Sequence, residues 1–417
     1  MKNMSRSRFA IDNASILFLA QFRRDHTNTF RFTMTLTEPI SPDILQTAVN
    51  NTYRRFPTII ASFKPGIFAY FQVPVEAPPK VQPDPGCLIT MTKEELYRCA
   101  YRVFYAGNTV SIEAFHALTD GYGAIASFTT LVAEYLRLKN GAQIPVSGTL
   151  LDIHQIPQTH EVEDSFQKYQ SNNPKRLPSR YAYQLPGGKD KRESILTSSY
   201  KVSTVGLLDA AHRYGVSLNT LISSVMAASV MEIQQMKSNS KLQPVRIMVP
   251  VNLRRLFPSR TLRNFSYYVL PTMEPEDSEK PLSALITSFS DQIHTQTRQD
   301  QMQNVISNNV KLQNAWFFRI IPLPVKFALM RLVCRFFGER TSSITVTNLG
   351  NVSLPEEMRS FITHMDVTLT PRMLSPYGCT VLSYNGTLTI NLSRFPQQSE
   401  LDDVFFQNLN KVLCSED

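Results

Sequence analysis

The clearest pattern of apolar and polar positions lies between residues 108 and 140. Over 110–115 apolar side chains alternate with other residues, and this period of two predicts a half-buried strand that ends at His116. A polar step follows, and apolar residues then recur at helical spacing over 121–140. A histidine is therefore expected where a buried strand passes into a loop, a place where many folds keep reactive side chains.

The rest of the chain alternates between strand-like and helix-like patterns. Strands are predicted at 30–35, 58–63, 68–73, 194–202, 245–251, 342–348, 365–370, 379–383 and 387–393, the last two joined by a type I′ turn at Asn385 and Gly386. Helices are predicted at 42–53, 203–214, 217–231, 281–318 and 400–413. Residues 94–104 fit either element, and the proline-rich residues 74–85 read as a loop. This order predicts an α/β or α+β fold with mixed sheets.

The length of the chain predicts two domains, because 417 residues exceed a single typical core. Residues 148–193 mix proline, glycine, asparagine and charged residues with little periodicity, and we interpret them as the connection. The expected division is an N-terminal lobe over 1–175, which carries His116, and a C-terminal lobe over 176–417.

Composition excludes several classes of protein. Apolar residues make up 42% of the chain, but no run approaches the length of a transmembrane helix. The basic N-terminus has only a short, interrupted apolar stretch and no small-residue cleavage site, so we expect no signal peptide and a cytoplasmic location. The five cysteines are scattered and the seven histidines lack ligand spacing, so neither a disulfide framework nor a metal site is expected.

The net charge of +9 and a pI near 9.2 favour anionic partners, such as a phosphorylated cofactor, an acidic carrier protein or a membrane surface. The sequence contains no nucleic-acid recognition motif, and its basic residues lie in three separate areas, so we expect no nucleic-acid partner. Residues 320–340 are apolar with interspersed cations. A core helix with snorkelling cations is the favoured interpretation. An interfacial helix on an anionic membrane is the alternative.

Two interpretations compete for the H-x-x-x-D-G pattern that begins at His116. In the structural one, His116 is a hydrogen-bonded core histidine, Asp120 caps the helix and Gly121 eases the turn. In the functional one, His116 is a general base, because imidazole titrates near working pH. Three fixed positions alone favour the structural interpretation, so the remaining chain has to decide.

Three separated stretches together resemble one known superfamily. The sequence FHALTDG at 115–121 resembles the H-H-x-x-x-D-G signature of coenzyme-A-dependent acyltransferases and peptide-synthetase condensation domains, with Phe115 in place of the first histidine. PVNLR at 250–254, followed by LRNF at 262–265, resembles the strand and loop of that superfamily. TNLG at 347–350 resembles the S-N-x-x-G segment of its wax-ester-synthase branch. Within the superfamily, the chain is most similar to stand-alone bacterial alcohol acetyltransferases.

The resemblance implies two chloramphenicol-acetyltransferase-like lobes that meet in a V-shaped pseudo-dimer with a central tunnel. It makes His116 the catalytic base, at the position of the second signature histidine. It makes Asp120 structural, directed away from the histidine toward an arginine, for which Arg254 is our first candidate and Arg263 our second. Gly121 shapes the same loop.

The oxyanion or substrate-binding candidates are Thr347, Asn348 and Asn264, with a turn-forming Thr-Asn pair as the alternative role for the first two.

The predicted activity is acyl transfer, with acetyl as one candidate group, from a coenzyme A thioester to an alcohol or, as the less favoured acceptor, an amine. Such a transfer needs a base and oxyanion donors but no metal and no enzyme nucleophile. No bound cofactor is expected, and acyl-coenzyme A is the co-substrate. The first alternative is a stand-alone condensation enzyme that forms amides from carrier-protein thioesters. The second is a catalytically silent member that binds a ligand or partner, an alternative that Phe115 keeps open.

Overall fold

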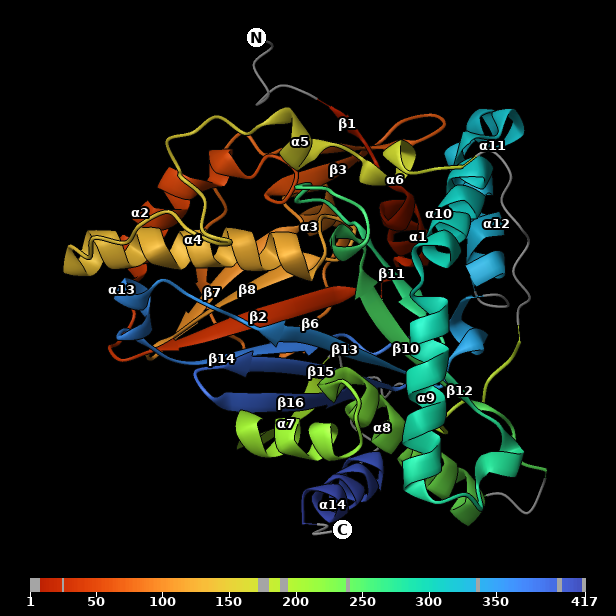
Figure 1. Cartoon of the computed structure of the whole chain (residues 1–417). Helices are drawn as coiled ribbons and strands as arrows, with labels where there is room; N and C mark the ends of the chain where they lie inside the picture. The colour runs from red at the N-terminus through yellow and green to blue at the C-terminus, as the bar shows by residue number, and fades with distance from the viewer. Residues whose placement is uncertain are drawn as a thin grey trace.

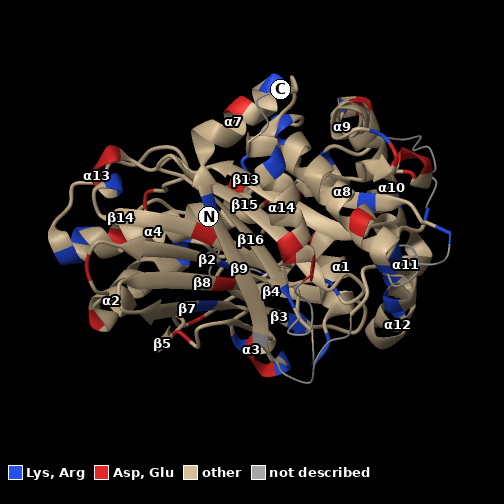
Figure 2. Ribbon diagram, turned by 90° about the horizontal axis from the view of Figure 1, so that it is seen from below, with Lys and Arg blue, Asp and Glu red and all other residues tan. Residues whose placement is uncertain are grey.

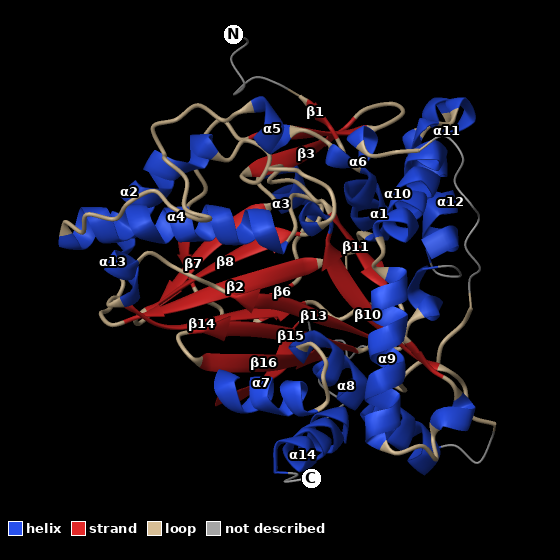
Figure 3. Ribbon diagram, in the orientation of Figure 1, coloured by secondary structure: helices blue, strands red, loops and turns tan. Residues whose placement is uncertain are grey.

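The fold is mixed α/β, as the sequence predicts, and consists of three β-sheets with helices packed against them (Figures 1 and 3). It is described from a computed structural model. The structure describes residues 8–24, 26–171, 180–187, 194–237, 241–334, 338–395 and 400–414. The Asn385–Gly386 turn has positive φ at both residues, 48° and 75°, which confirms the predicted type I′ hairpin.

The first large sheet carries the histidine strand at its centre. Its five strands lie in the order β14 (Ile362–Leu369), β2 (Thr29–Leu36), β8 (Thr109–Phe115), β7 (Tyr101–Ala106) and β5 (Val81–Pro83). Helices α2 (Pro42–Thr52) and α4 (Gly121–Asn140) lie side by side over it (Figure 1). A three-stranded sheet of β1 (Phe9–Ala10), β4 (Tyr70–Pro74) and β3 (Ala61–Pro65) adjoins it.

The second large sheet has eight strands. Seven lie in the order β11 (Ser266–Val269), β10 (Val245–Asn252), β13 (Ile344–Asn351), β15 (Tyr377–Tyr384), β16 (Thr387–Arg394), β9 (Ser194–Ser203) and β6 (Leu88–Ile89), with β12 (Thr272–Met273) beside β10. The helices that pack with it are α7 (Thr204–Arg213), α8 (Leu218–Lys237), α9 (Leu282–Gln296) and α14 (Glu400–Cys414). The pairs β10–β13 and β13–β15 are parallel, so the sheet is mixed.

The remaining helices lie around these sheets. They are α1 (Asn13–Gln21), α3 (Lys93–Arg98), α5 (Thr159–Val162), α6 (Ser165–Lys168), α10 (Gln299–Asn314), α11 (Trp316–Ile320), α12 (Leu323–Val333) and α13 (Glu356–Arg359). The ambiguous residues 94–104 form α3 and then β7, and the predicted loop at 74–85 contains the short strand β5, which pairs in parallel with β7. Of the predicted connection, 172–179 and 188–193 lie outside the described residues.

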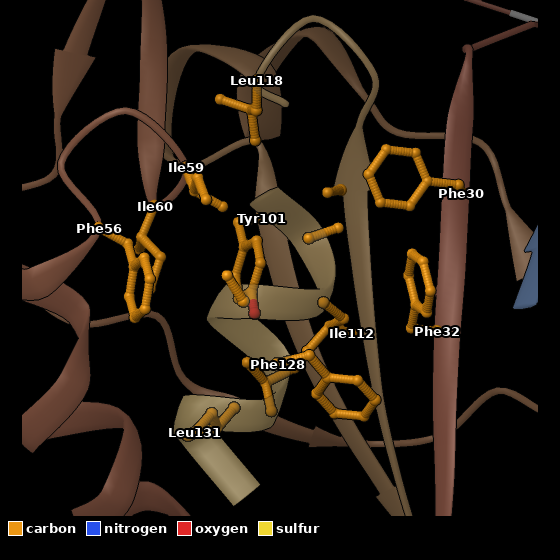
Figure 4. Close-up of a cluster of buried hydrophobic side chains, with 14 of the residues drawn as sticks. Phe30, Phe32, Phe56, Ile59, Ile60, Tyr101, Ile112, Leu118, Phe128 and Leu131 are labelled. Atoms are coloured by element: carbon orange, nitrogen blue, oxygen red, sulfur yellow. The ribbon is translucent and has the colours of Figure 1, made fainter. Parts of the chain in front are cut away.

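Two hydrophobic clusters form the cores, one for each large sheet. Figure 4 shows part of the first, where Phe30 and Phe32 of β2 and Ile112 of β8 lie near Phe128 and Leu131 of α4. The alternating side chains of the strands meet the apolar stripe of the helix, which is the packing that the two sequence periods predict.

Two strands cross the division that we proposed at residue 175. β14 comes from the second half but completes the first sheet, with Met365 opposite Met34 on β2. The Val367 carbonyl on β14 accepts hydrogen bonds from the side chains of Thr380 and Asn391 in the second sheet. In exchange, β6 from the first half pairs with β9. The two halves are thus joined through shared strands, and the division into lobes stays a prediction.

The apolar segment 320–340 has one packed and one exposed side. Leu323 and Phe327 of α12 are buried in the first core. The buried Lys326 ammonium donates to the Phe68 carbonyl at 2.6 Å and lies 4.8 Å from the Phe318 ring. The favoured core packing therefore holds for this side, and the opposite side exposes Val325, Leu329, Leu332 and Val333. Arg335 lies outside the described residues.

None of the described helices is by itself long and apolar enough to cross a membrane. The bent pair of α7 and α8, at 81° to each other, meets that criterion by length and composition only.

Candidate active site

His116 directly follows β8, which confirms the strand-end location predicted from the alternating pattern. Its backbone N–H donates to the Asn28 carbonyl at 2.8 Å, which extends the pairing of β8 with the chain before β2. Because β8 is hydrogen-bonded to β2 on one side and β7 on the other, the histidine backbone has little freedom to move.

The imidazole of His116 lies between two aromatic rings. Phe18 of α1 stacks on it at a centroid distance of 4.3 Å, and Phe30 of β2 meets it edge-on at 5.2 Å. The Nδ1 atom is buried and has no hydrogen-bond partner within the described part of the chain, whereas the residue as a whole stays partly accessible. The solvent-accessible atoms of His116 are therefore atoms other than Nδ1.

Burial lowers the pKa of His116 from its ordinary value of 6.5. Several groups raise this pKa, among them the carbonyl of His116 itself, the charge of Asp120 and the side chain of Asn264. Their combined effect is smaller than that of burial, so the pKa is lowered overall. Burial therefore favours the neutral ring, which has a lone pair with which to accept a proton.

Phe115 points to the other side of the strand and belongs to the first core. Its ring meets those of Phe22 and Phe63 edge-on, both at 5.9 Å, and the side chain is fully buried. Successive strand residues face opposite ways, so Phe115 does not share the surroundings of His116. Phe115 therefore occupies an apolar core position.

Asp120 is held by the second half of the chain. Its Oδ2 accepts from Arg254 Nη1 at 2.7 Å and from the Phe265 backbone N–H at 2.8 Å, and its Oδ1 accepts from the Gly123 N–H at the start of α4. The predicted Asp120–Arg254 ion pair is confirmed. Arg263, our second candidate, instead pairs with Asp12 at 3.4 Å.

The guanidinium of Arg254 makes several contacts around this loop. Besides Asp120 it donates to the carbonyls of Thr261 and Arg263, and it lies 4.6 Å from the ring centre of Tyr122. Because the side chains of Asp120 and Arg254 are both almost fully buried, the pair fixes the start of α4 against residues 261–265.

The segment 261–265 also holds the backbone around the histidine. Asn264 Nδ2 donates to the His116 carbonyl at 3.0 Å, and the Thr119 hydroxyl donates to the Leu262 carbonyl at 2.6 Å. The Oδ1 atom of Asn264 is buried without a hydrogen-bond partner among the described residues. Asn264, proposed from the sequence as a donor to substrate, thus has one amide hydrogen engaged in positioning His116.

The strand end that carries Thr347 and Asn348 comes close to the start of α4. A Cβ atom built on Gly121 would lie 2.5 Å from Leu349 Cδ2, so Gly121 and the end of β13 are in direct contact. Asn348 Oδ1 accepts from the Gly350 N–H at 2.8 Å, which is the local turn role that the sequence left open, and its Nδ2 is the remaining donor. Thr347 makes no side-chain hydrogen bond within the described ranges.

Sequence reasoning missed the contribution of α1. Besides Phe18 on the imidazole, this helix places Ser15 so that its hydroxyl donates to the Ala117 carbonyl at 2.6 Å. The only signal available was the four-residue spacing of Phe18 and Phe22 on one helical face, and nothing in it points to residues near 116. Within the described residues no group of three or more His, Cys, Asp or Glu side chains could hold a metal ion.

Neither a protein-family model nor a curated protein matches the sequence. Solved structures, in contrast, match over almost the whole length. The first condensation domain of the calcium-dependent antibiotic synthetase is similar, with a TM-score of 0.64 and 14% identity over 98% of this chain and 96% of that one.

Two further structures are similar as well. The wax ester synthase/diacylglycerol acyltransferase from Marinobacter aquaeolei VT8 has a TM-score of 0.57 and 12% identity, covering 97% of this chain and 98% of its own. TRI101 of F. sporotrichioides, complexed with coenzyme A and T-2, has a TM-score of 0.59 and 12% identity over 96% of each chain. The chain therefore has the fold of these structures, a condensation domain and a wax ester synthase/diacylglycerol acyltransferase among them, and this is the fold that the sequence resemblance implies.

Proposed function

We propose that this protein is an acyltransferase that moves an acyl group from a coenzyme A thioester to an alcohol, or with lower preference to an amine. His116 is the general base. The observation that carries the proposal is the setting of this ring: held by Phe18 and Phe30 at the end of a central strand, still partly accessible, and with a pKa that burial lowers.

The chemistry requires one proton to move twice. Nε2 of His116 accepts the proton of the acceptor hydroxyl as its oxygen bonds to the thioester carbon, which gives a tetrahedral oxyanion. When the carbon–sulfur bond breaks, the ester forms and the proton passes to the departing coenzyme A thiolate. No covalent intermediate on the enzyme is needed, because holding acceptor and donor together replaces it.

Donors for the oxyanion come from the second half of the chain in this proposal. Asn348 Nδ2 and the Thr347 hydroxyl are the candidates, because β13 reaches the start of α4 through the Leu349–Gly121 contact. Asn264 is a positioning residue, since it holds the His116 carbonyl. Asp120 and Arg254 shape the loop and do not exchange protons with substrate.

The test is a screen for thiol release and product formation by the purified protein. Acyl-coenzyme A donors of different length are each mixed with a panel of alcohols and amines, and the same acyl groups are supplied on a phosphopantetheinylated carrier protein. We expect acceptor-dependent thiol release from coenzyme A and ester products by mass spectrometry.

The two alternatives predict other patterns in this screen. Amide formation only from the carrier-bound donor would identify a stand-alone condensation enzyme and overturn the coenzyme A donor. Absence of product with every donor, combined with measurable binding of an acyl-coenzyme A, would identify a catalytically silent binding protein.

A further inference from the structure

One side of the molecule exposes a set of large apolar side chains that come from separate segments. We call it the α11–α12 face and define it by α11, α12 and the tip of the β3–β4 hairpin. Its exposed residues are Ile67, Phe68, Trp316, Phe317, Ile320, Val325, Leu329, Leu332 and Val333. Trp316 and Ile67 are 74% and 75% exposed, which is far more than a packed side chain of this size retains.

Hydrogen bonds join the hairpin tip and α1 to α12. The Leu323 N–H donates to the Ile67 carbonyl at 2.9 Å, and Lys326 donates to the Phe68 carbonyl, so the hairpin tip lies beside the first turn of α12. α1 packs along α12, where Arg331 Nε donates to the Ala20 carbonyl at 2.9 Å. Exposed apolar side chains that gather on adjoining segments are typical of an interaction site.

The charges around this face have one sign. Between Asp300 and Glu339 the sequence contains no acidic residue and five basic ones, Lys311, Arg319, Lys326, Arg331 and Arg335. Figure 2 shows blue bands on α11 and α12 without red ones. Exposed apolar side chains flanked by cations match the two layers of an anionic bilayer, which presents phosphate groups over hydrocarbon.

We propose that the α11–α12 face docks on the surface of an anionic lipid bilayer. The apolar side chains of α11, α12 and the hairpin tip enter the interfacial layer, and Arg319, Arg331 and Lys311 contact lipid phosphates. Trp316 lies among them, and its amphipathic ring suits the headgroup level. α1 separates this face from the candidate base, since it contacts α12 on one side and stacks Phe18 on His116 on the other.

Trp316 is the only tryptophan of the chain, so its fluorescence reports on this face alone. The whole protein is titrated with vesicles of phosphatidylcholine and with vesicles of phosphatidylcholine and phosphatidylglycerol in equal parts. We expect a blue shift of emission and co-sedimentation with the anionic vesicles, weakened by salt because the electrostatic part is screened. No shift and no co-sedimentation with either vesicle would overturn the proposal, and so would equal binding to both.

The apolar part is tested with Ile320→Glu and Leu329→Glu, both at exposed positions, against Val205→Glu as a matched control on α7, where the valine is 63% exposed. We expect each face variant to weaken vesicle binding about tenfold or more, and the control to bind like the parent protein. Equal loss in all three variants would assign binding to charge alone and contradict the docking face.

The charge contribution is tested with Arg319→Gln, which keeps the apolar surface. We expect weaker binding to anionic vesicles and a reduced dependence on salt. A second copy of the chain is the competing occupant. Blue-shifted emission without vesicles, together with a dimer in sedimentation that Leu329→Glu dissociates, would overturn the membrane proposal in favour of self-association. Neither readout needs catalytic activity, so failure of the proposed reaction would leave this test intact.

Discussion

The Nδ1 atom of His116 has no hydrogen-bond partner in the described part of the chain, and burial disfavours the imidazolium form. Both features favour the neutral form of a ring that packs against Phe18 and Phe30. A general base works best when its pKa lies near the operating pH and below it, because the base form then predominates.

The lowered pKa of His116 predicts the pH dependence of transfer. Protonation removes the base, so kcat/KM should fall as the pH decreases through the pKa of the free enzyme. Because burial lowers that pKa from 6.5, the midpoint of the fall in kcat/KM should lie below pH 6.5. Initial rates of thiol release across a pH series give the midpoint. A midpoint well above 6.5 would show that another group controls the rate.

Phe115 gives a second prediction at this scale. Phe115→His places a second histidine directly before His116 but puts a polar ring between Phe22 and Phe63. We expect a loss of about 1–3 kcal/mol in the free energy of unfolding, because the new polar atoms have no partner there. We expect no gain in transfer rate. Denaturant unfolding and thiol release measure the two effects, and a faster enzyme of parental stability would refute this account of the position.

Some residues of the candidate site could be identified from the sequence because a local pattern of residues marks their position. His116 stands at the end of a regular alternation, and Asp120 and Gly121 follow at the signature spacing. The partners that hold them could not be found this way. Asn264 is 148 positions from His116, and its hydrogen bond to the His116 carbonyl depends on how the two sheets are packed.

At the scale of elements, the start of α4 is the junction between the two halves. Asp120, the N-cap of this helix, contacts Arg254 and Phe265, and the next turn lies against Leu262. A change in this turn therefore alters both the helix cap and the position of the second half.

Asp120→Asn should reduce stability at least as much as activity. The substitution neutralises one partner of a nearly fully buried ion pair, which leaves the Arg254 charge uncompensated and costs about 3–5 kcal/mol where burial is deep. Thermal unfolding of Asp120→Asn, Arg254→Gln and the double variant measures this. The double variant should lose less than the sum of the single losses. An Asp120→Asn protein that melts like the parent but is inactive would point to a direct catalytic role.

Two glycines in equivalent helix positions give a matched comparison. Gly123 in α4 and Gly206 in α7 each stand three residues after the N-cap, and each N–H donates to the cap side chain at 3.4 Å. A Cβ on Gly123 would lie 2.1 Å from the Leu262 carbonyl oxygen, whereas one on Gly206 meets nothing nearer than 3.9 Å.

We therefore expect Gly123→Ala to destabilise the protein by about 1–3 kcal/mol through overpacking against the backbone. Gly206→Ala should stabilise it by up to about 1 kcal/mol, because alanine loses less conformational freedom in a helix. Chemical denaturation of both variants is the measurement. Equal effects of the two substitutions would mean that the backbone at Leu262 moves and makes room for the new methyl group on α4.

Elements with one clear period were predicted well, and those whose place depends on distant partners were not. The strand over 387–393 and the helix over 121–140 need only local sequence, and β16 and α4 match them closely. The three residues of β5 are too few to show a strand period, so the sequence predicts a loop there. They form a strand because they pair with β7. α12 fits both interpretations of 320–340, because one of its faces is packed and the other exposed.

At the scale of the whole molecule, the sequence predicts the mixed α/β class but not the exchange of strands between the halves. The edge of the first sheet is completed by β14, whose pattern as a strand carries no information about which sheet it joins. Residues 261–265 and the end of β13, both from the second half, contact the histidine loop of the first half. The candidate site therefore belongs to both halves.

The measurement that tests the central claim most directly is the rate of coenzyme A release by His116→Ala in the presence of an acyl-coenzyme A and an alcohol accepted by the parent protein. His212→Ala, which removes an exposed histidine on α7, is the control. We predict that His116→Ala lowers the rate by about a hundred- to ten-thousand-fold while both variants keep the parental unfolding transition. Undiminished turnover by a folded His116→Ala protein would contradict the account.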